Sequence, residues 1–325
     1  MNDYTLAALR LLEDGGFHSG EAIGQRLGVT RESISTALEA IEAHGLAIDR
    51  VRGKGYRLLT PVRWLDRAQI RQHLGAFAGR FDVEVVDQTV STNSDLIVRA
   101  AQGAASRLVR VAELQTGGRG RRGRSWSSGL GDALTFSVLW RFDQGAGFLS
   151  GLSLAVGVAI ARALAEAGLE GVMLKWPNDV LWRHMKLAGI LIELAGDVMG
   201  PTSAVIGIGL NVRLAEPVLD RIDQPVTDLA RAGIDIDRNR LLATLLMELD
   251  RTMDAFSAGG FASLRAEWEQ AHAYQDKMVK LRMPDGAEQE GRVSGVADDG
   301  ALLLSVPSGT RKYYGGEISL RLSRN

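Results

Sequence analysis

Residues 113–126 read ELQTGGRGRRGRSW, and this stretch decides which fold the surrounding chain can adopt. Gly118, Gly120 and Gly123 satisfy a formal G-x-G-x-x-G pattern, which marks a dinucleotide-binding fold when it opens a helix directly after a strand. Here the glycines lead into SWSSGLG, which is typical of a loop rather than a helix. The stretch therefore argues against a dinucleotide-binding fold and predicts a glycine-rich loop.

The arginines of this stretch predict that the loop binds an anion. We call residues 117–124 the arginine loop. Guanidinium groups bind phosphate and carboxylate oxygens as forks, and glycines let the backbone come close to a ligand. Because clustered like charges repel one another, the loop should be mobile without an anion and ordered with one. A solvated basic loop or a localisation patch is the alternative. The arginines are Arg119, Arg121, Arg122 and Arg124.

A second group of charged residues begins with the motif KWPND. Lys175 offers a point charge and Trp176 a stacking surface, while Asp179 is a carboxylate that could hold a magnesium ion near phosphates. The stretch KLAGILIE begins with Lys186, which leads into an otherwise apolar strand. Such a lysine needs either an anionic partner or a route to solvent, so an anion-binding lysine and a snorkelling strand-end lysine both fit.

Two polar groups accompany these motifs. The first stands at the expected start of a helix, where hydroxyl groups and free backbone N–H groups can clamp a small polar headgroup. The second lies in the strand VIGIGLNV, where glycine removes the side chain and could admit a ligand. Ordinary capping and bulge roles explain each group on its own. The residues are Ser91, Thr92, Asn93, Gly207, Gly209 and Asn211.

Residues 5–60 predict a winged helix-turn-helix. Two helices are joined by the tight turn LGVT, and the segment LAIDRVRGKGYRLL alternates as two strands of a hairpin. A small helical domain with no DNA role is the alternative, since residues 1–62 hold seven Lys and Arg against eight Asp and Glu. The second of these helices has Thr30 as its cap and an apolar stripe at helical spacing, formed by Ile34, Ala37, Leu38 and Ile41.

The rest of the chain divides into two further parts. From about Trp64 to Trp268, strands and helices alternate without a fixed repeat, which indicates a mixed α/β core. After Tyr274 the strands VKLRM, GRVSGVA, ALLLSV and TRKYY are separated by PDG, DDG and PSG turns, the pattern of a small β-barrel. We predict an α+β multidomain protein with a winged helix-turn-helix (1–62), a mixed α/β domain (63–272) and a small SH3-like β-barrel (273–325).

The composition narrows the function classes. With 46% hydrophobic and 24% charged residues, the chain of 325 residues can bury two or three cores. It contains no cysteine, which excludes disulfides and thiolate zinc sites and favours a cytoplasmic location. The net charge of -1 argues against a protein that coats nucleic acid, so local clusters must bind any anion. The most apolar stretch, 152–168, includes Arg162 and Glu166, so a buried helix is expected and no membrane contact.

The order of the motifs is more specific than any one of them. STN, Q-x-x-G-R-G-R-x-G-R-x-W, KWPND, KLAGILIE, GIGLN and the C-terminal GGEISLR follow one another. This succession strongly resembles bacterial biotin protein ligases over nearly the whole chain. With its winged helix, the chain resembles the bifunctional members, which are both ligase and biotin operon repressor.

The resemblance implies a biotin-[acetyl-CoA-carboxylase] ligase. Biotin and ATP would react, with Mg²⁺ on the nucleotide, to give biotinyl-5'-AMP and pyrophosphate. A lysine of the biotin carboxyl carrier protein would then receive the biotin. The repressor half implies that biotinyl-AMP favours a homodimer, which binds operator DNA and represses biotin genes.

The resemblance also assigns roles by motif match. Lys186 would face the reacting carboxyl and phosphoryl oxygens. The catalytic residues would be Lys186, Arg121 and Lys175. Biotin and biotinyl-AMP would contact Ser91, Thr92, Asn93, Gln115, Gly118, Arg119, Gly120, Arg121, Arg124, Trp126, Lys186, Gly189 and Asn211. The nucleotide and metal would be held by Lys175, Asn178 and Asp179. The winged helix would contact DNA through Arg31, Ser35, Thr36, Arg50, Arg52 and Lys54.

Two other functions stay open. The first is a ligand-responsive transcription factor without ligase activity, against which the full set of cationic motif residues argues. The second is a lipoate ligase or related acyltransferase, although GRGRRG and KWPND favour biotin. The recognition helix carries Glu32, Glu39 and Glu42 beside Arg31, which predicts weak operator binding by one module.

Overall fold

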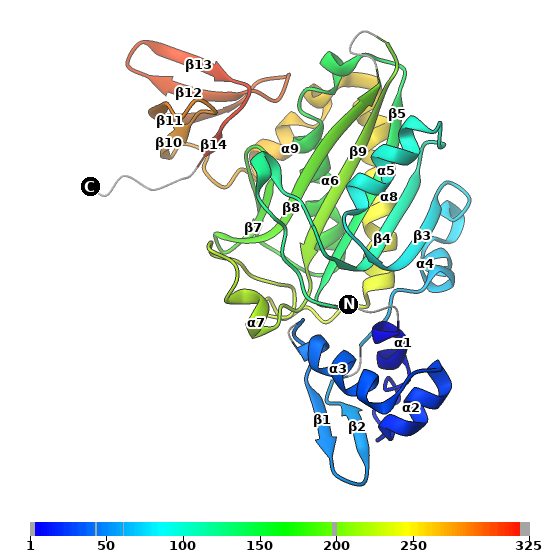
Figure 1. Ribbon diagram of the computed structural model, residues 1–325. Helices are drawn as coiled ribbons and strands as arrows, with labels where there is room; N and C mark the ends of the chain where they lie inside the picture. Colours follow the sequence, from blue (N-terminus) through cyan, green and yellow to red (C-terminus); the bar gives the residue numbers. More distant parts are fainter. Residues whose placement is uncertain (1–3, 43, 61, 197–199, 319–325) are drawn as a thin grey trace.

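The computed structural model of the chain describes residues 4–42, 44–60, 62–196 and 200–318. Three units follow one another along the chain: helices with a hairpin, a seven-stranded sheet between helices, and a five-stranded sheet (Figure 1). This arrangement confirms the predicted α+β multidomain fold.

The N-terminal unit has the predicted helix-turn-helix geometry. Ser19 caps the second helix by accepting a hydrogen bond from Ala22 N at 3.1 Å, and Gly28 ends that helix in the left-handed region. Thr30 Oγ1 accepts from Ser33 N at 3.2 Å and so caps the third helix. The elements are α1 (Thr5–Arg10), α2 (Gly20–Leu27), α3 (Arg31–Glu42), β1 (Ile48–Val51) and β2 (Gly55–Leu58).

The core of the N-terminal unit continues into the central unit. Ile34, Leu38 and Ile41 of α3 are fully buried, as the apolar stripe predicts. The same hydrophobic cluster includes Leu114 and Leu130, which lie on either side of the arginine loop. The two units therefore share one apolar core.

The central sheet has the strand order β3-β4-β5-β9-β8-β7-β6. β3 and β4 are parallel, while the other neighbours are antiparallel. The strands are β3 (Asp82–Thr89), β4 (Leu108–Gln115), β5 (Ala133–Phe142), β6 (Val172–Lys175), β7 (Asp179–Trp182), β8 (Met185–Gly196) and β9 (Thr202–Asn211).

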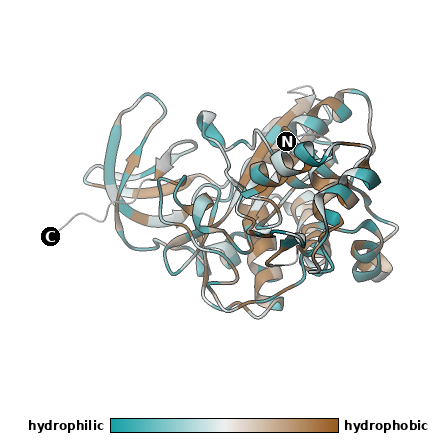
Figure 2. Ribbon diagram, turned by 60° about the horizontal axis from the view of Figure 1, so that its bottom comes forward, coloured by the Kyte–Doolittle hydropathy of each residue, from teal (hydrophilic) through white to brown (hydrophobic). Residues whose placement is uncertain are grey.

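Helices cover both faces of this sheet (Figure 1). In β5, Phe136 and Val138 belong to one apolar cluster and Leu139 to another, as the two-residue period of a strand requires. The cluster of Leu139 lies under α5, whereas α6 and α8 pack against the opposite face. Hydrophobic ribbon is gathered in these central strands and helices (Figure 2). The helices are α4 (Arg67–Leu74), α5 (Thr92–Ala101), α6 (Leu152–Glu166), α7 (Glu216–Leu219), α8 (Arg238–Gly259) and α9 (Arg265–Gln270).

The apolar helix α6 is an internal helix, as its composition predicts, and ten of its residues are buried. Within the described residues, no helix combines the length and the hydropathy that crossing a bilayer requires.

The C-terminal unit is an antiparallel sheet in the order β13-β12-β11-β10-β14. The PDG, DDG and PSG turns place Gly286, Gly300 and Gly309 in the left-handed region, which explains glycine at each turn. Beyond the four predicted strands, Ile318 pairs with Leu281. Barrel closure stays a prediction, and the motif GGEISLR lies partly outside the described residues. The strands are β10 (Met278–Arg282), β11 (Glu288–Val296), β12 (Leu302–Val306), β13 (Gly309–Tyr313) and β14 (Glu317–Ile318).

A buried ion pair joins four segments beneath the arginine loop. Arg238 Nη2 lies 2.6 Å from Glu113 Oε2, and the side chains are 3% and 0% exposed. The guanidinium also donates to the carbonyl oxygens of Arg63 and Ala133. The other oxygen of Glu113 accepts from Leu65 N. The pair thus fixes the linker, the end of β4, the start of β5 and the start of α8.

We expect Arg238→Met to lower the free energy of unfolding by about 3–5 kcal/mol, because Glu113 would stay buried without its counter-charge. The exposed pair of Arg67 and Asp82, 3.0 Å apart, provides the control. Arg67→Met should cost less than about 1 kcal/mol. Urea unfolding of both variants tests this, and equal losses would contradict a structural role for the buried pair.

Candidate functional site

A cavity of about 910 Å³ opens over one edge of the central sheet. Its walls come from the arginine loop, the start of α5, the turn between β6 and β7, and strands β8 and β9. Of the ligand-binding residues expected from the sequence, Gly118 alone does not line it. The others are Ser91, Thr92, Asn93, Gln115, Arg119, Gly120, Arg121, Arg124, Trp126, Lys175, Asn178, Asp179, Lys186, Gly189 and Asn211.

One end of the cavity is built from uncharged hydrogen-bonding side chains. Gln115 Oε1 accepts from the backbone N–H and the hydroxyl of Thr92, at 2.8 and 3.2 Å. The Thr92 hydroxyl lies 2.7 Å from Ser137 Oγ, which donates to Asn93 Oδ1 at 2.5 Å. We call Ser91, Thr92, Asn93, Gln115 and Ser137 the neutral end. Its amide and hydroxyl groups hold one another in fixed orientations.

The parallel pairing of β3 and β4 explains why these residues meet. Thr89 and Gln115 pair at the carboxyl ends of the two strands. The chain leaves β3 at that edge and enters α5, whose first turn is capped by Ser91. Ser91 and Gln115 therefore lie side by side. Their proximity depends on the pairing of β3 with β4, not on either element alone.

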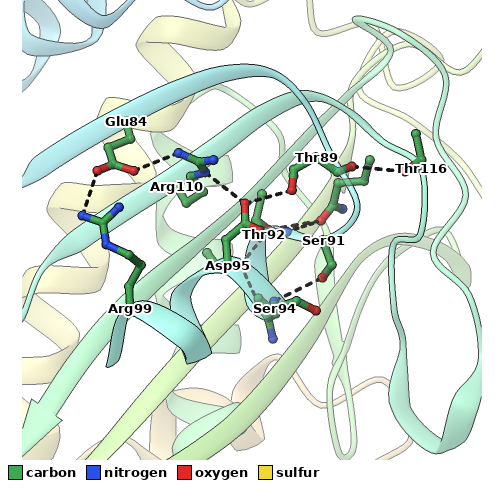
Figure 3. A network of polar contacts seen from close by, with 12 residues as sticks. Glu84, Thr89, Ser91, Thr92, Ser94, Asp95, Arg99, Arg110 and Thr116 are labelled. Atoms are coloured by element: carbon green, nitrogen blue, oxygen red, sulfur yellow. Dashed lines mark hydrogen bonds and ion pairs between the residues drawn. The ribbon is translucent and has the colours of Figure 1, made fainter. Parts of the chain in front are cut away.

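A charged network supports α5 from behind the neutral end (Figure 3). Asp95 Oδ2 accepts from Thr89 Oγ1 at 2.8 Å and from Arg110 Nε at 3.0 Å. Arg110 and Arg99 both contact the carboxylate of Glu84, at 2.9 and 3.2 Å. These contacts attach the helix to β3 and β4 and so fix the residues of its first turn.

Two glycines of β9 line the cavity, and their missing side chains also leave room for neighbouring protein side chains. A methyl group on Gly207 would lie 2.2 Å from Asn93 Oδ1. One on Gly209 would lie 2.4 Å from the ring of Trp126. Trp126 Nε1 is buried and has no hydrogen-bond partner within the described residues. The indole therefore brings an unused donor to the cavity.

The other end of the cavity carries two lysines and an aspartate. Lys186 Nζ lies 2.8 Å from Asp179 Oδ1, and Lys175 Nζ lies 3.8 Å from Asp179 Oδ2. Lys175 and Asp179 face each other across the turn between β6 and β7, and Lys186 comes from the adjacent strand β8. We call these three residues the cationic end. The carboxylate lets two ammonium groups converge while the group stays positive overall.

The arginine loop bridges the two ends. Arg119 Nη2 lies 2.8 Å from Glu193 Oε2, which also accepts from Asn93 Nδ2 at 2.8 Å. Further along, Arg121 donates to Asn178 Oδ1 at 3.2 Å. The loop thus contacts β8 beside the neutral end and the KWPND turn beside the cationic end.

Trp176 lines the cavity, and its indole is also attached to the C-terminal unit. Its side chain is 2% exposed, and its Nε1 donates to the carbonyl oxygen of Gly300 in the C-terminal unit at 3.0 Å. Trp126 also presents an indole over the floor of the cavity.

One wall of the cavity consists of residues that were not expected from the sequence to bind a ligand. The wall consists of residues 221–226 with His184, Tyr274 and Ile318. Burial raises the pKa of Tyr274 above its ordinary value, and the negative charge of Asp179 adds to the shift. These residues form no local pattern, so only the fold brings them together.

Residues 221–226 are attached to the strand that carries the cationic end. Lys186 N donates to Pro225 O at 3.0 Å, and Thr227 N donates to Lys186 O at 2.9 Å. Asn211 Nδ2 donates to Thr227 O at 2.9 Å. Asn211 therefore positions this wall as well as lining the cavity.

The end of the segment that follows the arginine loop contacts the N-terminal unit. Leu130 N donates to His44 O at 3.3 Å, next to Asp132 Oδ2, which accepts from Gly129 N at 2.7 Å. Burial lowers the pKa of His44, and the charge of Arg221 adds to the shift. A residue of the cavity wall thus acts electrostatically on the end of the helix-turn-helix.

Family comparisons assign each unit to a known domain type. Residues 85–211 match the Biotin/lipoate A/B protein ligase family. Residues 5–57 match an HTH domain, and residues 276–321 match the Biotin protein ligase C terminal domain.

Similar proteins extend over the same units. The bifunctional ligase/repressor BirA of Salmonella typhimurium is 38% identical over 323 residues, which is 99% of each chain. The biotin–[acetyl-CoA-carboxylase] ligase of Mycobacterium tuberculosis is 36% identical over 78% of this chain and 95% of its own. The structure of biotin protein ligase from Aquifex aeolicus in complex with biotin and ATP is 29% identical, with a TM-score of 0.63, and covers 74% of this chain and 99% of that chain.

The stem residue Asp132 predicts a pH dependence of stability. Burial raises its pKa from 3.8 to about 6, although the Gly129 N–H and the charge of Arg238 act in the opposite direction. Because folding favours the protonated form, its contribution is fully present below about pH 4 and is lost as pH rises through about 6.

Asp132→Asn should therefore gain roughly 2–3 kcal/mol of stability relative to the parent between about pH 4 and about pH 7. Urea unfolding across this range measures the difference. Asp235, whose pKa is lowered by a hydrogen bond from Arg63, is the control. Asp235→Asn should show no such rise, and parallel curves for the parent and Asp132→Asn would contradict the prediction.

Proposed function

The chain belongs to the biotin protein ligase family, and we propose that its cavity activates biotin with ATP and passes the biotinyl group to a lysine of a carrier protein. One observation carries the proposal: a single cavity joins a neutral hydrogen-bonding end to a cationic end. Lys186 and Leu191, which both line the cavity, lie five residues apart on β8, about 17 Å at the usual strand rise. The cavity is long enough for both halves of an acyl-adenylate.

The neutral end suits the ureido ring of biotin. That ring offers both N–H donors and a carbonyl acceptor but no charge. Thr92, Asn93 and Gln115 present hydroxyl and amide groups already fixed by one another, so binding would require little further ordering. A charged headgroup would find no counter-charge among these three residues.

The cationic end suits the chemistry of adenylation. A carboxylate oxygen of biotin forms a bond to the α-phosphorus of ATP, and the bond from that phosphorus to pyrophosphate breaks. Negative charge accumulates on the oxygens around the phosphorus, where Lys186, Lys175 and Arg121 would stabilise it. The carrier's lysine amine then attacks the acyl carbon, and AMP leaves with the proton lost to solvent. No nucleophile of the chain is needed.

Asp179 does not fit the expected magnesium ligand. Each of its oxygens faces a lysine ammonium group, Lys186 at 2.8 Å and Lys175 at 3.8 Å. Within the described residues, no cluster of three or more His, Asp or Glu side chains could hold a metal ion. We therefore assign Asp179 to positioning the lysines. Magnesium would enter the site bound to the phosphates of ATP.

The arginine loop would retain the reactive intermediate. An acyl phosphate hydrolyses in water, so a covering loop both holds and shields it. Arg119 and Arg121 contact opposite ends of the cavity from this one loop, and Trp126 adds a free indole donor. In this proposal, residues 1–62 bind DNA, residues 63–272 form the catalytic domain and residues 273–325 form an accessory domain. A reaction that consumes ATP is expected in the cytoplasm.

Incubation of the protein with ATP, Mg²⁺, biotin and an acceptor biotinyl domain tests the ligase proposal. Mass spectrometry should show a biotinyl adduct on one lysine, together with released pyrophosphate. Lipoate in place of biotin should give no adduct. Biotin binding without pyrophosphate release would favour a ligand-responsive transcription factor, and acylation by lipoate would favour a lipoate ligase.

The N-terminal unit supports a repressor of modest intrinsic affinity. On the face expected to meet DNA, Arg50 lies 3.0 Å from Glu42, and Ser35 Oγ donates to Glu39 at 3.2 Å. These carboxylates compete with phosphates for the same side chains. The expected DNA-contacting residues exposed on this unit are Arg31, Thr36, Arg50, Arg52 and Lys54. Two modules on a homodimer would double their number on a palindromic site.

Lys186→Met should slow biotinyl-AMP formation by about 10²–10³-fold, because a charge aimed at the developing oxyanions is lost. Lys312→Met, on the exposed strand β13, is the matched control and should be unaffected. Pyrophosphate release measures the first step, and transfer from added biotinyl-AMP measures the second. Adenylation at the parental rate would remove Lys186 from this role.

Biotin and ATP together should raise both the dimer fraction and the affinity for a palindromic biotin operator, whereas either alone should not. Sedimentation and mobility-shift assays measure the two responses. Arg52→Ala should leave the dimer intact but lower the salt slope of operator binding by about two per dimer. A monomer that ignores the operator under every condition would leave only the ligase half of the proposal.

A further inference from the structure

Trp176 lies where the catalytic turn meets the C-terminal sheet. Like Lys175, Asn178 and Asp179 of the same motif, it lines the cavity. Its indole also reaches the C-terminal unit, since Nε1 donates to Gly300 O at 3.0 Å. A buried indole with its N–H satisfied by another unit is a fixed point between the two.

The partner of this indole is the turn between β11 and β12, residues 297–301, which we call the C-terminal turn. The turn is seated by a second hydrogen bond, from Ser150 Oγ to Asp299 O at 2.6 Å. It also packs closely on the central unit, because a methyl group on Gly300 would lie 2.6 Å from the Cα of Gly151. These three contacts come from two segments of the central unit, the KWPND turn and residues 150–151, and they help to seat the C-terminal sheet.

The start of α6, which contacts the C-terminal turn, also contacts the KWPND motif. Ser153 Oγ, in the first turn of α6, donates to Pro177 O at 3.0 Å. The KWPND turn, the start of α6 and the C-terminal turn thus form one three-way junction. Displacement of the C-terminal sheet would be transmitted directly to the KWPND turn.

The C-terminal sheet contributes to the cavity through Ile318 of β14, and the segment leading to it contributes Tyr274. Both belong to the wall near the cationic end. The neutral end has no such dependence, since the side-chain hydrogen bonds of Thr92, Asn93 and Gln115 described above stay within the central unit.

Resting on the proposed ligase function, we propose that Trp176 is a positioning residue that seats the C-terminal sheet as a wall of the nucleotide half of the site. Its indole N–H acts through Gly300 on the placement of Tyr274 and Ile318. Biotin, bound at the neutral end, is insensitive to this contact. The C-terminal unit is then part of the site for ATP.

Trp176→Phe tests the proposal, because it keeps a buried ring and removes one hydrogen bond. The KM for ATP in biotin-dependent pyrophosphate exchange should rise about five- to tenfold, as expected for one lost hydrogen bond, while the KM for biotin stays within about twofold. Trp182→Phe is the matched control. Trp182 Nε1 also donates to a carbonyl oxygen, that of Glu170 at 3.1 Å, but contacts neither the cavity nor the C-terminal turn.

A second measurement does not depend on the reaction. Backbone amide exchange in the C-terminal turn should be faster in Trp176→Phe than in the parent and unchanged in Trp182→Phe. Ser150→Ala removes another of the hydrogen bonds to the turn and should shift the KM for ATP in the same direction, which provides a test if Trp176→Phe does not fold. An unchanged KM for ATP, equal rises for both substrates, or unchanged exchange would each overturn the inference. A parent protein without exchange activity would refute the ligase function instead, and the amide exchange would still decide the seating of the sheet.

Discussion

The buried pair of Arg238 and Glu113 is the constraint on which the site depends. The arginine loop carries four cations on a glycine-rich backbone, which is closed by hydrogen bonds from Gly120 N to Arg124 O and from Trp126 N to Gly118 O. Glu113 lies two residues before Gln115, and Ala133, whose carbonyl oxygen accepts from Arg238, directly follows Asp132. One guanidinium therefore holds both stems of the loop. A buried ion pair is costly to desolvate, and this one is tolerated because backbone groups of Leu65, Arg63 and Ala133 satisfy its remaining polar atoms.

The uncharged hydrogen-bonding groups and the charged groups of the site lie at different places along a single sheet. At the neutral end, the side chains use one another as hydrogen-bond partners, so their orientations are set in advance. At the cationic end, Asp179 offsets the repulsion between Lys175 and Lys186 without cancelling both charges. The antiparallel strands β7, β8 and β9 connect the two ends as rigid elements. A reaction between a carboxylate and a polyphosphate needs this combination, since a neutral part must be held while like charges are brought together.

Local patterns explain which parts were predictable. The stripe of α3, the cap at Thr30 and the glycine turns of the C-terminal unit depend on residues close in sequence, and these predictions are confirmed. All of the ligand-binding residues named from the order of the motifs except Gly118 line the cavity. The partners of those residues were not predictable in the same way. A glycine in a strand shows that a side chain is missing, but only the fold shows that Asn93 and Trp126 fill the space over Gly207 and Gly209.

The same limit applies to Trp176 and to residues 221–226. An aromatic residue inside a charged motif suggests a ligand contact, but it does not show that the indole N–H bonds a carbonyl group more than a hundred residues away in the chain. The wall at residues 221–226 has no charge pattern or repeat, and it reaches the cavity through backbone pairing with Lys186.

The shared apolar core restricts how this architecture could be simplified in evolution. Leu114 and Leu130 are 1% and 2% exposed because the helix-turn-helix covers them. Deletion of the first unit would expose a hydrophobic patch beside the arginine loop, which is proposed to cover the reactive intermediate. The Mycobacterium tuberculosis ligase, nearly all of whose length aligns with 78% of this chain, illustrates a shorter architecture. Evolution of such a form requires more than the loss of a gene segment, because the exposed leucines must be replaced by polar residues or covered by another part of the chain. The DNA-binding unit is therefore hard to lose once it has been acquired.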